Sequence, residues 1–167
     1  YNNKGDYVAH HPMPKEGGGD GYGYDIGINP QKNVFLTSSF TGWNNYMMDL
    51  GKLVKDGEAM KRFGNTMVAW DVKAMKPMKI FNVPGAPLEI RWAWGPKHNY
   101  AFTATALTSK LWLAYEDESG EWQAKEIGTI GGEGGVLPVD ISLSADDRTL
   151  FVSCFGDGKV RVFDVSN

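Results

Sequence analysis

Cysteine is nearly absent from the sequence, since Cys154 is the only one among 167 residues. A disulfide within the chain is therefore excluded, which fits a reducing compartment but does not exclude the periplasm. The formal net charge is only −3, which gives no reason to expect nucleic acid or an anionic membrane surface as a partner. No apolar run is long enough to span a bilayer, so we expect no membrane span.

Glycine and aromatic residues, by contrast, are plentiful. The chain has 21 Gly, and Phe, Trp and Tyr make up 13% of it. This combination is typical of short strands joined by tight turns. Hydrophobic residues at 42% and charged residues at 22% indicate an ordinary globular protein and argue against disorder.

One unit recurs three times along the chain. Each copy runs from an acidic residue and an isoleucine through a polar turn into an apolar strand and then a third strand, and the copies start at Asp25-Ile26, Glu89-Ile90 and Asp140-Ile141. The first two copies add a fourth strand, whereas the third copy ends one strand short. Four short antiparallel strands per repeat are the signature of β-propeller blades.

The turns and strands of the copies also agree in chemistry. Pro30 and Asn33 mark the first polar turn, and residues 95–99 repeat it almost type for type. Residues 73–77 predict a turn before the fourth strand of the first copy. Alternation in the second copy predicts that three side chains share one face of a strand: Ile90, Trp92 and Trp94. Third strands end in Trp70-Asp71-Val72 and Phe163-Asp164-Val165, endings that resemble those of WD-type blades.

The sequence therefore predicts an all-β fold of about three four-stranded antiparallel blades. The blade-like units lie at about 22–83, 87–130 and 138–167, and residues 1–167 form part of a single propeller domain. Three blades cannot close a ring, because propellers have about four to eight. We therefore expect the chain to be part of a larger, seven-bladed propeller. A β-sandwich with similar hairpins is the alternative.

Residues 41–64 interrupt the first unit and do not look like a strand. Their spacing predicts one or two short helices, with Gly64 as the C-cap. Long insertions in repeat proteins usually fall on a functional face. This helical insertion is thus the segment expected to cover a site or contact a partner, and a packed decoration without a role is the alternative.

At this point the residues resemble a known family, the selenium-binding proteins, which include bacterial methanethiol oxidases. Pro87-Leu88-Glu89-Ile90-Arg91-Trp92 is similar to the family's Pro-Leu-Glu-Ile-Arg-Phe and is the most specific match. The other matches are colinear and cover nearly the whole chain: Gly23-Tyr24-Asp25, Pro30-Gln31-Lys32-Asn33-Val34, Gly64 to Asp71, Gly120-Glu121-Trp122, Asp140-Ile141-Ser142-Leu143-Ser144, Asp146-Asp147-Arg148 and Phe163-Asp164-Val165-Ser166. Because the family's proteins are much longer, the resemblance also implies a fragment.

The resemblance implies a segment of a copper-dependent methanethiol oxidase. Such an enzyme converts methanethiol, O₂ and water to formaldehyde, H₂S and H₂O₂, so its partners would be a small thiol substrate and the rest of its own propeller or a homo-oligomer. A bacterial methanethiol oxidase would be periplasmic, and other members would be cytoplasmic. The alternative is a non-catalytic propeller that binds selenium, a thiol or a partner protein.

Copper in this family is bound by histidines, and the paired ones stand in a His-His-Ser-Gly-Trp motif that this chain lacks. The ligands are therefore expected outside the segment, and no catalytic residue is assigned within it. His10 and His11 are the weak metal candidates, because imidazole suits copper. They are expected on a strand before Gly17, where neighbouring side chains point to opposite faces and would not easily share one ion.

The remaining chemical candidates favour structural roles. His98 is expected as a solvated turn residue, and Cys154 as a buried, inert thiol. The irregularly spaced methionines indicate packing. The glycine-rich stretch at residues 131–135 precedes a strand and lacks the Lys-Ser/Thr of a phosphate loop, so it reads as a connector between blades. The recurring acids are expected to accept backbone or arginine hydrogen bonds between blades, although they could also line a central channel: Asp25, Glu89 and Asp140.

Overall fold

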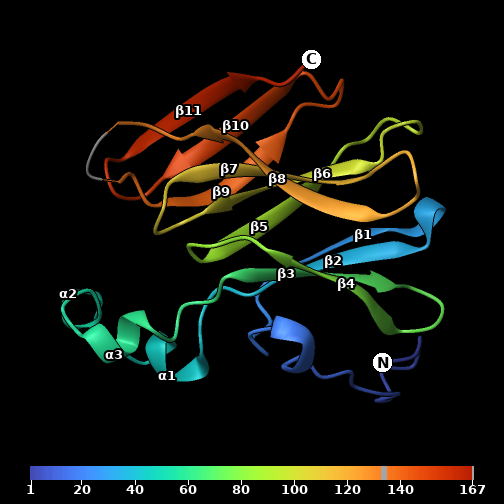
Figure 1. Ribbon diagram of the computed structural model, residues 1–167, viewed down its shortest axis with the longest axis horizontal. Coiled ribbons are helices and arrows are strands. Elements are labelled where there is room, and N and C mark those ends of the chain that lie inside the picture. The colour runs from blue at the N-terminus through green and yellow to red at the C-terminus, as the bar shows by residue number, and fades with distance from the viewer. Residues whose placement is uncertain (133–134, 167) are drawn as a thin grey trace.

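The computed structural model describes residues 1–132 and 135–166, and in this part of the chain eleven strands form three antiparallel sheets (Figure 1). The first two sheets have four strands each and the third has three, as the repeats predict. Strands follow one another in sequence order within every sheet. The first sheet consists of β1 (Ile26–Asn29), β2 (Val34–Ser38), β3 (Thr66–Asp71) and β4 (Lys76–Asn82).

The second and third sheets repeat this order. The second is built from β5 (Pro87–Trp92), β6 (Tyr100–Thr105), β7 (Lys110–Glu116) and β8 (Trp122–Thr129). The third contains β9 (Pro138–Leu143), β10 (Thr149–Cys154) and β11 (Lys159–Asp164). We call the three sheets blade one, blade two and blade three.

The blades stack face to face and bury apolar side chains between them. The cluster between blades one and two includes Leu36, Met67 and Ile90, and the one between blades two and three includes Phe102, Ile141 and Leu150. Burying one such side chain contributes about 1.5–3 kcal/mol. Because β2 and β3 are central strands covered on both faces, almost all of their side chains are buried.

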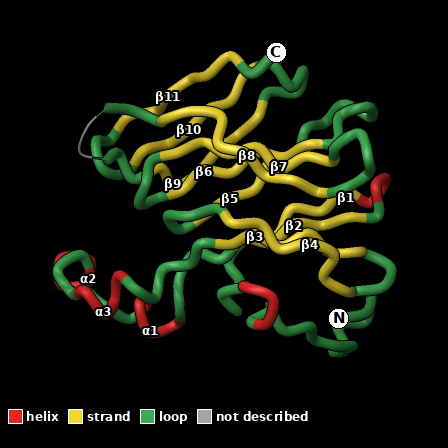
Figure 2. The backbone as a smooth tube through the Cα atoms, in the orientation of Figure 1, coloured by secondary structure: helices red, strands yellow, loops and turns green. Residues whose placement is uncertain are grey.

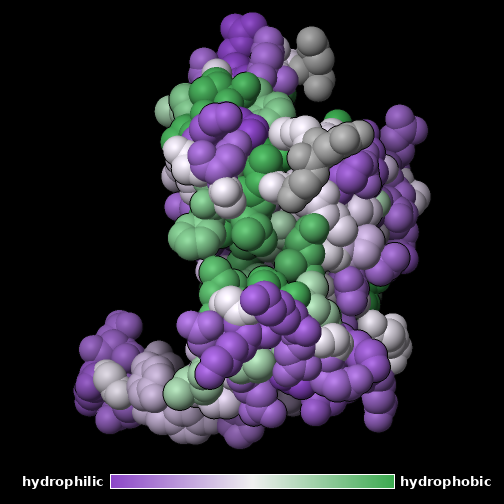
Figure 3. Space-filling model, turned by 90° about the vertical axis from the view of Figure 1, so that its left-hand side faces the viewer, coloured by the Kyte–Doolittle hydropathy of each residue, from purple (hydrophilic) through white to green (hydrophobic). Residues whose placement is uncertain are grey.

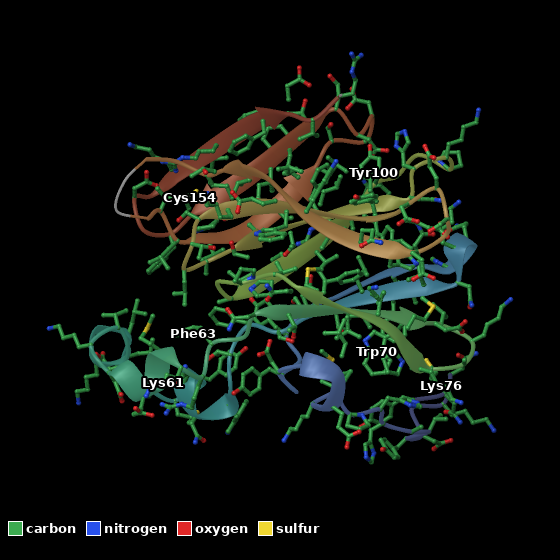
Figure 4. All side chains as sticks on the ribbon, in the orientation of Figure 1. Lys61, Phe63, Trp70, Lys76, Tyr100 and Cys154 are labelled. Carbon is green, nitrogen blue, oxygen red and sulfur yellow. The ribbon has the colours of Figure 1, made fainter. Side chains whose placement is uncertain are left out.

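The N-terminal segment covers the other face of blade one. The ring of Trp70, labelled in Figure 4, stacks there on that of Phe35 with the centroids 5.5 Å apart, and Met13 packs against them. A short 3₁₀ helix, η1 (Glu16–Gly18), lies in this segment, which otherwise runs as coil (Figure 2). His10 and His11 lie in that coil, so the expectation that they sit on a strand is wrong.

The polar turns form as predicted from their residue types. Pro30 starts the short 3₁₀ helix η2 (Pro30–Lys32), and Asn33 closes it with φ +56°. Asp147 has φ +59° in the corresponding turn of blade three. Asn and Asp tolerate this left-handed backbone better than other L-residues do, which explains their presence at these positions.

The helical insertion contains three short helices where one or two were expected: α1 (Trp43–Tyr46), α2 (Leu50–Leu53) and α3 (Gly57–Met60). Asp49 and Asp56 cap α2 and α3 by accepting backbone N–H bonds in the first turn. Figure 2 shows the three helices projecting from one end of blade one. The insertion joins the end of β2 to the start of β3, so it lies on the face of the propeller where the connectors between blades also run.

Three local expectations are wrong. Gly64 is not a helix C-cap: α3 ends at Met60, and Gly64 is required because a Cβ there would lie 2.0 Å from the carbonyl oxygen of Ser39. Lys76 and Pro77 belong to β4, where proline is tolerated because β4 is an edge strand. Trp94 lies beyond the end of β5 and is exposed, so it does not share the face of Ile90.

Candidate functional site

The first strands of the blades converge at one edge of the stack. β1, β5 and β9 each form an edge of their sheet, and in a propeller such edges surround the central channel. β1 and β5 approach so closely that a Cβ on Gly27 would lie 2.7 Å from Cγ2 of Ile90. We call this region the inner edge.

One arginine meets an acidic residue from every blade at the inner edge. Nη1 of Arg91 lies 3.2 Å from Oε2 of Glu89 and 3.5 Å from Oδ2 of Asp25. Its Nη2 lies 2.9 Å from Oδ1 of Asp140. Asp140 thus accepts an arginine hydrogen bond between blades, as expected, and Asp25 forms an ion pair across the other blade boundary. Glu89 lies on the same strand as Arg91, so its arginine contact stays within blade two. We call these four residues, together with Tyr24, the inner-edge cluster.

Backbone groups and a phenol complete the cluster. The N–H of Ile90 donates to Oδ2 of Asp25 across the blade boundary at 2.7 Å. The hydroxyl of Tyr24 donates to Oε1 of Glu89 at 3.2 Å, again across the boundary. Asp140 accepts the N–H of Ile141 at 2.8 Å. The acid that opens each repeat is thus used to join neighbouring blades.

The cluster holds three carboxylates around one guanidinium, and its pKa values reflect this excess of negative charge. Burial raises the pKa of Glu89, the nearby Asp25 raises it further, and Arg91 opposes both. Burial and the adjacent Glu89 raise the pKa of Tyr24 to about 12. Tyr24 therefore stays protonated and can donate its hydrogen bond throughout the physiological pH range.

Aromatic rings connect the inner edge to the helical insertion. The ring of Phe40 lies 5.3 Å from that of Tyr24 and 6.0 Å from that of Tyr46, both edge to face. Phe63, labelled in Figure 4, lies 5.5 Å from Phe40 on the side of the insertion. We call Tyr24, Phe40 and Tyr46 the aromatic row, and both tyrosines in it are exposed.

Buried polar contacts fix the insertion in place. Asn45 is 3% exposed, and its amide donates to the hydroxyl of Thr41 at 2.7 Å and to the carbonyl of Ala59 at 2.9 Å. Its own side-chain oxygen accepts from Nε of Arg62 at 2.9 Å. The side-chain nitrogen and oxygen of Asn45 are both hydrogen-bonded inside the insertion. Asn45 therefore ties α1 to α3 and holds Tyr46 at the end of the aromatic row.

The weak metal candidates lie in the N-terminal coil without further metal-ligating side chains grouped around them in the described residues. His10 and His11 are both exposed, and Nδ1 of His10 is hydrogen-bonded to the hydroxyl of Tyr7. Within residues 1–132 and 135–166, no three His, Cys, Asp or Glu side chains are grouped so that they could hold a metal ion. The donor set that copper requires is thus not assembled by the described residues, and metal binding by His10 or His11 stays a prediction.

His98 has a structural partner that the sequence did not reveal. Its Nδ1 lies 2.6 Å from Oδ2 of Asp147, and its ring stacks on Tyr100 at 5.2 Å. Asp147 is 4% exposed and also accepts the N–H groups of Trp94 and Gly95, both at 2.7 Å. The side chain of His98 is 41% exposed, so the turn histidine is solvated as expected, but the turn of blade three also places a buried carboxylate beside it.

The other candidates are structural. Cys154 is 3% exposed and faces the core between blades two and three (Figure 4), as expected for an inert thiol. The methionines range from buried Met67 to exposed Met47, as expected for side chains that pack without a shared site. Part of the predicted connector at 131–135 lies outside the described residues, namely positions 133 and 134.

The face that carries the insertion and the connectors is shown in Figure 3. Apolar residues form a band across the stack of blades on this face, and hydrophilic residues flank it. In the described part of the chain, no helix is both long enough and apolar enough to cross a membrane.

Stacked antiparallel sheets of four, four and three strands, with converging first strands, define this chain as part of a β-propeller protein. A family model for the 56 kDa selenium-binding proteins (SBP56) matches residues 6–167. The chain belongs to this family, and the resemblance seen in the sequence is confirmed.

Two bacterial relatives match over nearly the whole chain. A methanethiol oxidase of Hyphomicrobium sp. is 68% identical over 167 residues, which cover 99% of this chain and 38% of the relative. A methanethiol oxidase of Ruegeria pomeroyi is 57% identical over 179 residues, which cover 100% of this chain and 41% of the relative. The chain thus spans about two fifths of the length of these curated relatives.

A solved structure supports the fold. The hypothetical selenium-binding protein of Sulfolobus tokodaii superposes with a TM-score of 0.74 and 26% identity, over 87% of this chain and 36% of that protein. The predicted fold class, all-β with propeller blades and a helical insertion, is confirmed, and among the described residues the three sheets do not close into a ring. The number of seven blades and the assignment of residues 1–167 to a single domain stay predictions.

Proposed function

We propose that the intact protein containing this chain oxidises methanethiol with O₂ and water to formaldehyde, H₂S and H₂O₂. The observation that carries the proposal is the 68% identity to a methanethiol oxidase across 99% of the chain. A second methanethiol oxidase at 57% identity supports it. In this reaction the carbon atom is oxidised, its bond to sulfur breaks, and O₂ takes up the electrons as peroxide.

The segment contributes part of the wall around a channel. The inner-edge cluster holds β1, β5 and β9 together through Arg91, which contacts acidic residues of all three blades. The aromatic row places apolar rings beside these charges. A polar group next to an apolar surface suits a small ligand that has one ionisable end and one apolar end.

Copper belongs to the proposal through the family resemblance, with its ligands in the part of the protein beyond this segment. His10 and His11 are exposed and adjacent, and His98 is already paired with Asp147. No described residues gather into a metal-binding group. We therefore assign no copper ligand within this chain and route no step of the reaction through its histidines.

The proposed partners are the rest of the same propeller and a small thiol. The outer face of blade three carries exposed apolar side chains, including Phe151, Val160 and Val162. Blade faces of this kind are buried against the next blade in a closed propeller, because single sheets cannot bury both faces alone. We propose that the remaining polypeptide covers this face, and a homo-oligomer is the other arrangement that would do so.

The test uses the intact protein. Purified full-length protein is supplied with methanethiol in an oxygen electrode, and formaldehyde, sulfide and peroxide are measured in the same samples, together with the copper content. We expect oxygen uptake that matches the three products. Binding of methanethiol without oxygen uptake by copper-loaded protein would overturn the proposal and support the alternative of a non-catalytic thiol-binding propeller.

A further inference from the structure

The inner-edge cluster contains one carboxylate whose contacts between blades leave it able to accept further hydrogen bonds. We propose that Glu89 accepts the S–H proton of a small alkyl thiol at the inner edge, and that the aromatic row receives the alkyl group. This inference rests on the proposed function and assigns residues of this chain to the same site. It adds a proton acceptor and a substrate-binding surface that sequence resemblance alone does not indicate.

The contacts of Glu89 leave it able to accept a further proton. Oε1 accepts from the hydroxyl of Tyr24 and Oε2 from Arg91, both at 3.2 Å. Each carboxylate oxygen can accept two hydrogen bonds, so both oxygens retain free acceptor capacity. The side chain is 21% exposed, which leaves it accessible from the channel side while most of it is shielded from water.

The other two carboxylates of the cluster accept shorter hydrogen bonds from N–H groups. Asp25 accepts the N–H of Ile90 at 2.7 Å, and Asp140 accepts Arg91 at 2.9 Å and the N–H of Ile141 at 2.8 Å. Among the described residues, Glu89 accepts hydrogen bonds only from Tyr24 and Arg91, and both are longer, at 3.2 Å. We therefore assign the role of proton acceptor to Glu89.

The proposed step is a proton transfer that leaves the number of electrons unchanged. The S–H bond of the thiol breaks, an O–H bond forms on Glu89, and the products are a thiolate and a neutral carboxylic acid. Thiolates are far more reactive than thiols. A carboxylate whose pKa is raised towards the working pH is the better general base, and burial beside Asp25 raises the pKa of Glu89 in this way.

The aromatic row accounts for the rest of the thiol. Tyr24 contacts Glu89 through its hydroxyl and Phe40 through its ring, so the apolar surface begins directly at the carboxylate. Tyr46 extends this surface from the helical insertion. Sulfur and methyl groups pack favourably against aromatic rings. The site therefore suits a short, uncharged alkyl thiol better than a thiol that carries a carboxylate, which the surrounding acids would repel.

Titratable groups on several elements lie in or next to the inner-edge cluster that contains Glu89. Tyr24 and Asp25 precede β1, Arg91 lies on β5, Asp140 lies on β9, and Tyr46 belongs to the insertion. Arg91 is the only cation among these five. The pH profile of a Glu89 variant would thus still reflect the four acidic or phenolic neighbours and the one basic neighbour.

The test compares Glu89→Gln, Glu89→Asp and Tyr24→Phe in the full-length protein. Glu126 on the outer strand β8, exposed and paired with Lys110, supplies the control Glu126→Gln. For Glu89→Gln we expect kcat/KM for methanethiol to fall by about 100-fold or more, with loss of the acidic limb of the pH profile. Glu89→Asp is expected to restore part of the activity. Tyr24→Phe removes a donor to the charged form, so the acidic limb should move to higher pH.

Melting temperature and copper content separate this role from a merely structural one. They should be unchanged in Tyr24→Phe, which keeps the ring in the aromatic row. Activity of Glu89→Gln within about threefold of wild type, with the same acidic limb, would overturn the inference while the proposed function stands. An unshifted limb in a folded Tyr24→Phe would overturn it even if Glu89→Gln failed to fold. A wild-type protein that does not oxidise methanethiol would overturn both.

Discussion

Oδ2 of Asp147 lies 2.6 Å from Nδ1 of His98, and this contact joins the polar turn of blade three to that of blade two. The same carboxylate accepts the backbone N–H groups of Trp94 and Gly95. Burial alone would raise the pKa of Asp147, but these N–H donors and His98 outweigh it and lower the pKa. The pair is therefore a pH-dependent tie between two blades.

The first prediction concerns Asp147→Asn in the intact protein. At pH 7 we expect the free energy of unfolding to fall by about 1–3 kcal/mol, because a charged acceptor of three hydrogen bonds is lost. A carboxyl whose pKa is lowered in the folded state stabilises the protein above its unfolded pKa of about 3.9, and this contribution disappears as the pH falls through the folded pKa. The gap between variant and wild type should thus close in acid.

Urea unfolding between neutral pH and acid measures this gap. Glu118→Gln, a change at an exposed position in the hairpin turn between β7 and β8, serves as the control and should leave stability unchanged. A gap of constant size down to the lowest pH at which the wild type folds would contradict the assigned role of Asp147.

The second prediction concerns Arg91→Met. Without the guanidinium, Asp25, Glu89 and Asp140 face one another with no counter-ion, so we expect a loss of about 1–3 kcal/mol in stability. Lys61→Met removes an exposed ion pair with Glu58 and should change stability by no more than about 0.5 kcal/mol. Thermal unfolding of the intact protein compares the two. Equal effects would mean that the inner-edge cluster contributes no more than a surface ion pair.

The third prediction concerns Gly64→Ala. The added Cβ would lie 2.0 Å from the backbone oxygen of Ser39, so β2 or β3 must shift, at a cost of about 1–3 kcal/mol. Gly57→Ala is the matched control, because nothing lies within 4 Å of a Cβ there and the residue starts α3. It should be neutral or stabilise the protein by up to about 1 kcal/mol. Urea midpoints of the two variants that moved together would argue against this assignment.

The fourth prediction compares two buried threonines on β6. Thr103 and Thr105 are both 0% exposed, but Oγ1 of Thr103 has no hydrogen-bond partner among the described residues, whereas Oγ1 of Thr105 contacts the hydroxyl of Thr108 at 2.6 Å. Thr103→Val should leave stability unchanged or raise it by about 1 kcal/mol, and Thr105→Val should lower it by about 1 kcal/mol. Denaturant midpoints of the two variants would have to differ in this order.

Much of the fold could be predicted from the sequence because it is local. Each strand is bounded by turn residues within a few positions, and Asp25, Glu89 and Asp140 mark the start of every unit. Side-chain alternation and turn chemistry act over short distances, so the sequence is enough to predict the strands of all three blades. The length of β4 was underestimated because Pro77 usually indicates a turn, and only the edge position of the strand makes it tolerable.

The site was harder to predict because its contacts join residues far apart in the sequence. Arg91 reaches Asp140, 49 positions away, and nothing near either residue indicates the other. His98 and Asp147 are also 49 positions apart in the sequence. Both stand in the polar turn of their repeat, so a comparison of the two turns could suggest that they pair. The N-terminal coil looks like a strand in the sequence because its packing surface on blade one cannot be recognised from residues 1–22 alone.

The outermost strand of blade one has a further consequence for how the protein behaves in concentrated solution. An edge strand exposes unpaired backbone groups that invite strands of other molecules to add to the sheet. In β4 these groups are interrupted by Pro77, which has no N–H to offer, and flanked by the exposed Lys76 and Lys79. Two β4 strands from different molecules would repel each other through these lysines and could not form a continuous ladder of hydrogen bonds, so the outer edge of blade one resists aggregation.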